Sequence, residues 1–117
     1  MMTMITVEEL ELLAFFEVEP ELCDPATPWP YNDFTYQLQL GQYHIHFGIS
    51  PAYRDVSIRI RHADIEIYSL NALSVKDVCY QKNAEGESLD IRISDSEHIV
   101  FKLRPHFSIA QNLADRS

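Results

Sequence analysis

Apolar and polar residues alternate with a period of two along most of the chain from Asp33 onward. The alternation recurs in seven short rows. Their apolar residues are Phe34, Tyr36, Leu38 and Leu40; Tyr43, Ile45, Phe47 and Ile49; Val56, Ile58 and Ile60; Ile65 and Ile67; Val78 and Tyr80; Leu89, Ile91 and Ile93; and Ile99, Phe101 and Leu103. Such repetition is typical of antiparallel strands with one buried and one wet face. The pattern therefore predicts a meandering antiparallel sheet of six or seven strands.

Matching the apolar rows also brings opposite charges together on the other face of the sheet. The matched apolar pairs are Ile49–Val56, Phe47–Ile58, Ile45–Ile60, Ile60–Ile65, Tyr80–Leu89 and Ile91–Phe101. The charges that then meet are Arg61–Asp64, Arg59–Glu66, Asp77–Arg92 and Asp90–Lys102. Each such pair contributes only about 0.2–1 kcal/mol. A slip of one residue would nevertheless expose the apolar row and break these pairs together, so the charges support the predicted register.

Residues 6–18 are predicted to form an amphipathic helix. Thr6 followed by Glu9 matches a capping box, in which each side chain binds the other's free backbone N–H. The apolar positions at helical spacing are Leu10, Leu13 and Ala14, broadened by Leu12, Phe15 and Phe16. Pro20 ends the helix because proline has no backbone N–H to donate. The wide apolar arc indicates a helix that packs closely on a flat surface.

The expected fold class is α+β, with the N-terminal amphipathic helix packed on the six- or seven-stranded sheet or on a partly closed barrel. The length suits a single domain with one core. The predicted segments within 1–117 are a leader at 1–5, the helix at 6–18, a proline-rich extended linker at 20–32, the antiparallel sheet at 33–104 and a tail at 105–117. Residues 1–5 are set apart as a disordered or vector-like leader, because Met2 to Thr6 resembles the start of bacterial β-galactosidase.

Charge is distributed unevenly along the chain, whose formal net charge is −9. Residues 1–53 carry eight carboxylates and no Lys or Arg, while residues 54–117 hold ten acids and nine bases. Almost the whole deficit therefore lies in the first half. A negative field of this size opposes contact with phosphates, which argues against direct binding of nucleic acid or of an anionic membrane. It favours a basic protein as partner.

Several familiar chemistries lack their motifs in this sequence. Neither GxGxxG nor GxxxxGK[ST] occurs, and no GxSxG is present. Cys23 and Cys79 form no zinc pattern, and we expect two reduced thiols rather than a disulfide. No apolar run reaches the ~20 residues of a membrane span, and no secretion signal is recognisable. We therefore expect a cytoplasmic protein without a cofactor. A binding protein is expected more than an enzyme.

His44 and His46 form the one pattern that suggests a metal site. On a strand, an HxH sequence sends both imidazole rings to the same face, as several metal sites require. The predicted register places Arg61 and Arg59 directly opposite, where their charges would repel a dication. A third ligand is also unassigned. We therefore expect solvated or partner-facing histidines and keep the metal site as the alternative.

The residues expected to bind a partner are acidic side chains around the helix and exposed aromatic residues. They are Glu8, Glu11, Glu17, Glu19, Trp29, Tyr31 and Tyr53. Opposed potentials speed protein association, and Trp and Tyr often anchor interfaces. The structural alternatives are a solvated helix face for the carboxylates and a lid over the core edge for Trp29.

The sequence thus suggests a small acidic binding protein that recognises another, basic protein. In size and charge it resembles immunity proteins that neutralise nuclease toxins and phage-encoded inhibitors of nucleic-acid enzymes, an analogy of composition only. The main alternative is a small-molecule binder or minor enzyme that uses the sheet interior, with Tyr36, Tyr43, His44 or His46 at its mouth. A homodimer built through an unpaired edge strand is a further alternative.

Overall fold

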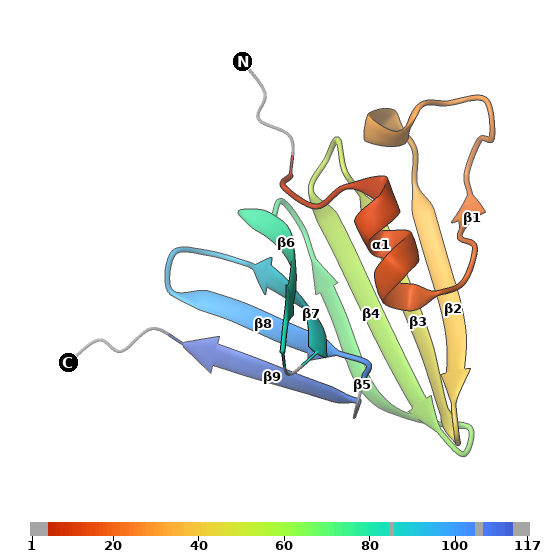
Figure 1. Cartoon of the computed structure of the whole chain (residues 1–117), viewed down its shortest axis with the longest axis vertical. Coiled ribbons are helices and arrows are strands. Elements are labelled where there is room, and N and C mark those ends of the chain that lie inside the picture. The colour runs from red at the N-terminus through yellow and green to blue at the C-terminus, as the bar shows by residue number, and fades with distance from the viewer. Residues whose placement is uncertain (1–4, 85, 105–106, 114–117) are drawn as a thin grey trace.

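A computed structural model describes residues 5–84, 86–104 and 107–113 of the chain, and the described part holds one α-helix and nine strands (Figure 1). The elements are α1 (Glu9–Phe16), β1 (Glu21–Leu22), a 3-10 helix η1 (Trp29–Tyr31), β2 (Phe34–Leu40), β3 (Tyr43–Ser50), β4 (Asp55–His62), β5 (Ile65–Ala72), β6 (Asp77–Asn83), β7 (Gly86–Arg92), β8 (Glu97–Lys102) and β9 (Ser108–Leu113). None of the helices in this part is long and apolar enough to cross a membrane. The fold is mostly antiparallel sheet with one short helix.

The strands form two sheets, so the prediction of a single meander of six or seven strands is wrong. One sheet has the order β1-β2-β3-β4-β5 and the other β6-β7-β8-β9, and the described strands show no pairing between them. The break follows β5, where Ser74 has a positive φ of 54°. Val75 then donates its N–H to the Arg54 carbonyl at 2.8 Å, and Lys76 donates to the Arg92 carbonyl at 2.7 Å. These bonds redirect the chain into a second sheet. Partial closure into a barrel is not confirmed.

The prediction that the helix packs on a sheet is confirmed, and α1 contacts both sheets (Figure 1). The ring of Phe16 stacks on Tyr36 of β2 at 4.7 Å and lies 4.9 Å from Phe47 of β3. The ring of Phe15 meets Phe101 of β8 edge-on at 5.7 Å. Two neighbouring residues of one helix thus join the two sheets into a single core.

The helix is shorter than the predicted 6–18 and begins differently. It starts at Glu9, with Glu8 as the N-cap, and the Glu8 N–H donates to Oε1 of Glu11 at 2.9 Å. The expected capping box of Thr6 and Glu9 is wrong. Thr6 instead donates its N–H and its hydroxyl to the carboxylate of Asp77, at 2.7 and 2.5 Å. The capping geometry therefore lies two residues further along.

The predicted apolar stripe of the helix is also corrected. The buried residues are Leu12, Phe15 and Phe16, while the stripe of Leu10, Leu13 and Ala14 is half-buried at best. Leu10 has 77% of its surface exposed. The reason is that the two phenylalanine rings fill the space between the sheets, which turns the Leu10 side to solvent.

Register in the first sheet is confirmed between β3 and β4 but wrong between β4 and β5. The pairs Ile45–Ile60, Phe47–Ile58 and Ile49–Val56 occur as predicted. Across β4 and β5, however, the partners are Ile60–Tyr68, Arg61–Glu66, Arg59–Ser69 and His62–Ile65, in place of Ile60–Ile65, Arg61–Asp64 and Arg59–Glu66. A β-bulge leaves Ile67 as the extra residue. Ile67 is exposed rather than buried, and so is Ile65, which lies at the end of β5 opposite His62.

Register in the second sheet is confirmed between β6 and β7 only. Asp77 pairs with Arg92 and Tyr80 with Leu89, as predicted. Between β7 and β8 the partners are Ile91–Ile99 and Asp90–Val100, in place of Ile91–Phe101 and Asp90–Lys102. The turn is tight, since the N–H groups of Ile93 and Ser94 both donate to the Glu97 carbonyl. A shift of two residues keeps every side chain on its face, so the alternation could not reveal it.

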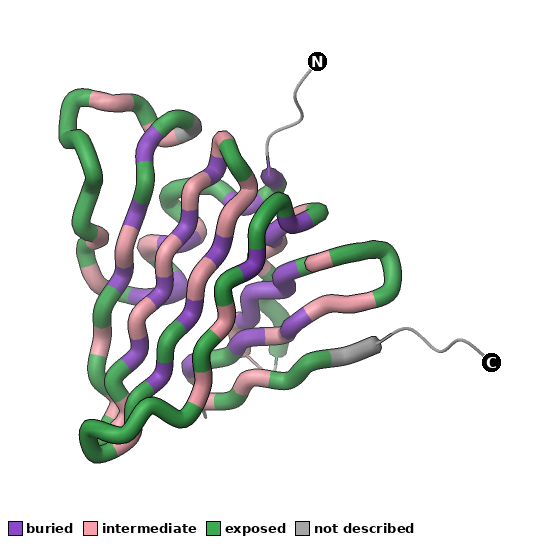
Figure 2. The backbone as a smooth tube through the Cα atoms, turned by 180° about the vertical axis from the view of Figure 1, so that it is seen from behind, coloured by how far each residue is buried: buried purple, intermediate pink, exposed green. Residues whose placement is uncertain are grey.

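The alternation itself is confirmed, as the striped burial of the sheets in Figure 2 shows. Ile58, Ile91 and Phe101 are fully buried. Three boundary segments differ from expectation. Ile5 of the predicted leader is buried, the predicted linker contains β1 and η1, and residues 108–113 of the predicted tail form β9. Phe107 of the predicted tail packs on Tyr43 and Phe101, and residues 1–4, 105–106 and 114–117 lie outside the described residues.

Candidate interaction surface

Carboxylates gather around α1 and β1, as the sequence predicted. The exposed ones in this region are Glu8, Glu9, Glu17, Glu19 and Glu21. Three of the predicted binding residues also take part in the fold, since Glu8 caps the start of α1. Glu11 is half-buried and accepts the Glu8 N–H, and Glu17 ends α1 in a left-handed conformation with φ of 58°. Glu8 and Glu19 remain exposed acidic groups.

The positively charged side chain of Arg104 contacts this acidic region at the end of α1. Both of its terminal nitrogens donate to the Phe15 carbonyl at 2.8 Å, which satisfies a free acceptor at the end of α1. The same guanidinium lies 3.2 Å from Oε1 of Glu17 and 3.6 Å from Oε1 of Glu87. Arg104 therefore fixes the end of the helix to the second sheet, and its charge offsets Glu17 in particular.

A small hollow of about 110 Å³ lies beside this helix. Its lining residues are Glu9, Leu13, Glu19, Pro20, Leu22 and Tyr36. Tyr36 is fully buried, and its hydroxyl has no hydrogen-bond partner within the described part of the chain. Burial, with the nearby carboxylates of Glu9 and Glu19, raises the pKa of Tyr36 well above its ordinary value of 10. The sequence did not predict that Glu9 and Tyr36 lie together, because the two residues are distant in the chain.

The predicted aromatic anchors lie at one end of the first sheet. Trp29 is half-buried and packs on Phe34 at 4.6 Å, as a lid over the core edge would. Tyr31 and Tyr53 are 71% and 73% exposed. The segment before β2 and the turn after β3 are joined where Ser50 donates to the Asp33 carboxylate at 2.6 Å. Tyr31 and Tyr53 thus project from adjacent loops, and their role in binding stays a prediction.

The HxH pair faces two arginines, as the register predicted. His44 lies opposite Arg61 and His46 opposite Arg59. Burial and then the Arg59 charge lower the pKa of His46 below its ordinary value of 6.5. Within the described ranges, no group of three or more His, Cys, Asp or Glu side chains is placed to hold a metal ion. Nothing in this part of the molecule therefore supplies the third ligand.

The predicted mouth of an internal binding site is not assembled. Tyr36 is buried under α1, whereas His44 is exposed on the opposite face of the first sheet. The space between the sheets is filled by aromatic rings, with Phe47 and Phe101 stacked at 6.2 Å. The interior thus consists of packed core.

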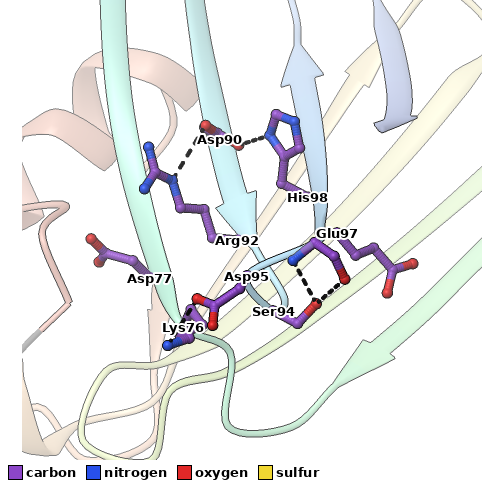
Figure 3. A pocket seen from close by; sticks show the side chains of 9 residues that line it. Lys76, Asp77, Asp90, Arg92, Ser94, Asp95, Glu97 and His98 are labelled. Carbon is purple, nitrogen blue, oxygen red and sulfur yellow. Dashed lines mark hydrogen bonds and ion pairs between the residues drawn. The ribbon is translucent and has the colours of Figure 1, made fainter. Parts of the chain in front are cut away.

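A larger polar hollow of about 530 Å³ lies against the second sheet (Figure 3). It is lined by Lys76, Asp77, Asp90, Arg92, Ser94, Asp95, Ser96, Glu97 and His98. Asp90 is buried and lies 2.7 Å from Nδ1 of His98 and 3.8 Å from Nε of Arg92. Lys76 pairs with Asp95 at 3.0 Å. Sequence reasoning missed this cluster because it expected Asp90 opposite Lys102. Its opposite charges largely satisfy one another.

Both cysteines are free thiols in the structure. Cys23 is exposed, and Cys79 is half-buried with its sulfur 3.5 Å from Oδ2 of Asp77. Burial, followed by the neighbouring Asp77 charge, raises the pKa of Cys79. The Cys79 thiol is therefore not activated as a nucleophile.

Comparison with known proteins identifies one informative likeness. No protein-family model and no curated protein sequence matches the chain. Among solved structures, the fold is similar to a chain of the complex of a contact-dependent growth inhibition toxin and an immunity protein from Klebsiella pneumoniae 342. The TM-score is 0.74 at 21% identity, covering 91% of this chain and 93% of that chain. The two chains therefore share their fold over nearly their full lengths.

Proposed function

We propose that this protein is an immunity-type binding protein, which neutralises a protein toxin by direct contact without catalysing a reaction. The observation that carries the proposal is the fold likeness, at a TM-score of 0.74, to a chain of a toxin–immunity complex. Because a fold can host unrelated functions, the likeness alone assigns no role. The charge of this chain supplies the second argument.

The surface charge favours the immunity role over the toxin role. With a net charge of −9, and with Glu8, Glu9 and Glu19 exposed around α1, the protein presents an anionic surface. A toxin that acts on nucleic acid needs Lys and Arg against the phosphates. An acidic protein complements such a surface, speeds encounter with it and can cover it. We therefore propose a basic partner.

Exposed aromatic residues would provide the specific contacts of this interface. Tyr31 and Tyr53 are largely exposed on adjacent loops of the first sheet. Interfaces are commonly anchored by Trp, Tyr and Arg, whereas rim charges mainly set the association rate. The proposed role requires no cofactor, and we propose that it is exercised in the cytoplasm.

The direct test is neutralisation of the toxin encoded in a reading frame adjacent to that of this protein. We expect that the neighbouring protein stops growth of a bacterial host when expressed alone, and that co-expression of this chain restores growth. The purified proteins should bind each other in calorimetry. Growth inhibition by this chain itself would assign it the toxin role, and absence of binding would overturn the proposal.

Charge reversal tests which surface is used. Glu8→Lys combined with Glu19→Lys should weaken binding of the adjacent-frame toxin about tenfold or more at low salt, about 1.4 kcal/mol. Each of the two substitutions is also made singly, and its matched control is Glu66→Lys, the same charge change at an exposed position of β5 away from α1. Equal effects of a single α1 substitution and of Glu66→Lys would indicate a net-charge effect without a site at α1.

A further inference from the structure

We propose that the hollow formed by Glu9, Glu19 and Tyr36 receives one basic side chain, a lysine or an arginine, of the partner protein. The inference rests on the proposed function, because it names the chemistry by which that same acidic surface would recognise its partner. The proposed function uses the negative charge of the whole surface, whereas this inference concerns one hollow that binds one side chain.

The three residues come from different parts of the fold. Glu9 opens α1, Glu19 follows the end of α1, and Tyr36 lies in β2 beneath the helix. The apolar walls of the hollow are Leu13, Pro20 and Leu22. A rim of two carboxylates above apolar walls suits the long side chains of Lys and Arg, which bury an aliphatic stem and present a charged end.

The Tyr36 hydroxyl is the observation that points to a ligand. Tyr36 is fully buried, and its hydroxyl oxygen has no hydrogen-bond partner in the ranges that the structure describes. A buried hydroxyl without a partner is unfavourable, and most such groups in folded proteins are paired. The same ring packed as phenylalanine would avoid this cost. Because Tyr36 lines the hollow, a donor that enters the hollow would instead satisfy the oxygen.

The carboxylates of the hollow are exposed and have no partner within the described part of the protein. Glu9 and Glu19 have no hydrogen bond or ion pair to any described residue, whereas Glu11 accepts a backbone N–H and Glu17 pairs with Arg104. The hollow therefore offers acceptors from all three groups. Ammonium carries three donors and guanidinium five, and neither accepts.

Size and composition argue for a side chain over other ligands. A volume of about 110 Å³ holds about four groups the size of a water molecule, each taking about 30 Å³. A nucleotide or a folded element cannot enter it. The hollow offers two carboxylates, fewer than the roughly six to eight oxygen ligands that Ca²⁺ takes, and the described residues hold no cluster of three ligating side chains.

Small basic probes test the hollow without the partner. We would titrate n-butylguanidinium and n-butylammonium into the whole protein and follow the NMR signals of Tyr36, Leu13 and Leu22. We expect saturable shifts at these three residues, with neutral n-butylurea binding at least tenfold more weakly. Shifts that do not saturate, or that are the same with n-butylurea, would overturn the inference.

Substitutions complete the test. Tyr36→Phe and Glu19→Gln should each weaken binding of n-butylguanidinium at least fivefold, whereas Glu21→Gln, a neighbouring exposed carboxylate outside the hollow, should change it less than twofold. Melting temperatures no lower than that of the wild type would show that the variants fold. Equal effects of Glu19→Gln and Glu21→Gln would overturn the inference in favour of general charge.

A double variant of the hollow, Glu9→Gln with Glu19→Gln, separates this inference from the proposed function. If the adjacent-frame toxin binds and Glu9→Gln with Glu19→Gln leaves its affinity unchanged, the hollow is not the receptor while the immunity role stands. If the probes bind the hollow but that toxin does not bind, the receptor chemistry stands and the immunity role fails.

Discussion

At the scale of single residues, Asp77 ties the start of the chain to the second sheet. Its carboxylate accepts the Thr6 N–H at 2.7 Å, the Thr6 hydroxyl at 2.5 Å and the Val78 N–H at 2.8 Å. Burial by itself would raise the pKa of Asp77. The hydrogen bonds from Thr6 and Val78 together outweigh burial and lower the pKa below its ordinary value of 3.8.

This lowered pKa makes a prediction about acid stability. Because the folded pKa lies below the unfolded value of about 3.9, the stabilising effect is fully present above pH 4. It is lost as pH falls through the folded pKa. Asp77→Asn should therefore lower the free energy of unfolding by about 1 kcal/mol at pH 7. The difference from wild type should shrink below pH 4, as measured by urea unfolding at a series of pH values.

The control for Asp77 is Asp95→Asn. Asp95 is an exposed carboxylate that pairs with Lys76 at the surface, where ion pairs contribute little. We expect a much smaller loss of stability from this change at every pH. A difference between Asp77→Asn and wild type that persists unchanged at pH 2.5 would contradict the assignment of the hydrogen bonds to the ionised carboxylate.

At the scale of elements, α1 holds the two sheets in one core because it packs against both of them. Its buried residues number three in a helix of eight, and two of them are phenylalanines that contact opposite sheets. A helix this short is marginal on its own, so its stability comes from that packing. Arg104 adds to it by binding the carbonyl at the helix end.

Two leucines in the same helix provide a matched test of this packing. Leu12→Ala should lower the free energy of unfolding by about 2–5 kcal/mol, because Leu12 is fully buried. Leu10→Ala makes the same chemical change on the exposed side and should cost less than about 0.5 kcal/mol. Denaturant unfolding measures both. Similar losses for the two variants would show that α1 packs in a different orientation.

At the scale of the whole molecule, the dominant feature is the separation of charge along the chain. The first 53 residues contribute eight carboxylates without a base, and the structure gathers many of them around α1 and β1. At 0.1 M ionic strength, charges act over about 10 Å, and this range shrinks as salt is added. The anionic surface therefore acts mainly during encounter with a partner.

This view predicts a rate effect in the proposed complex. The association rate constant with the basic toxin should fall at least tenfold between about 0.02 and 0.5 M salt, while the dissociation rate constant changes little. Stopped-flow fluorescence with Tyr and Trp signals measures both. An association rate that is independent of salt would contradict electrostatic steering, although the complex itself would still stand.

Much of the fold could be predicted from the sequence because the signals are local. Alternation marks the strands, so the burial of Ile58, Ile91 and Phe101 followed directly. The pairing of β3 with β4 also followed, since the two rows lie close together in the chain. The acids near α1 that we propose for the interface could be named from the sequence because charge is read directly from it, and the structure places Glu8 and Glu19 at the surface.

Tertiary structure alone decided the division into two sheets, the bulge at Ile67 and the register of β7 with β8. A slip of two residues, or a change of sheet, preserves the burial of each side chain, so periodicity does not distinguish these arrangements. The hollow at Tyr36 likewise depends on a helix and a strand meeting across the fold. Alternation specifies which face of a strand is buried, whereas the partner of that face is chosen by packing among residues far apart in the chain.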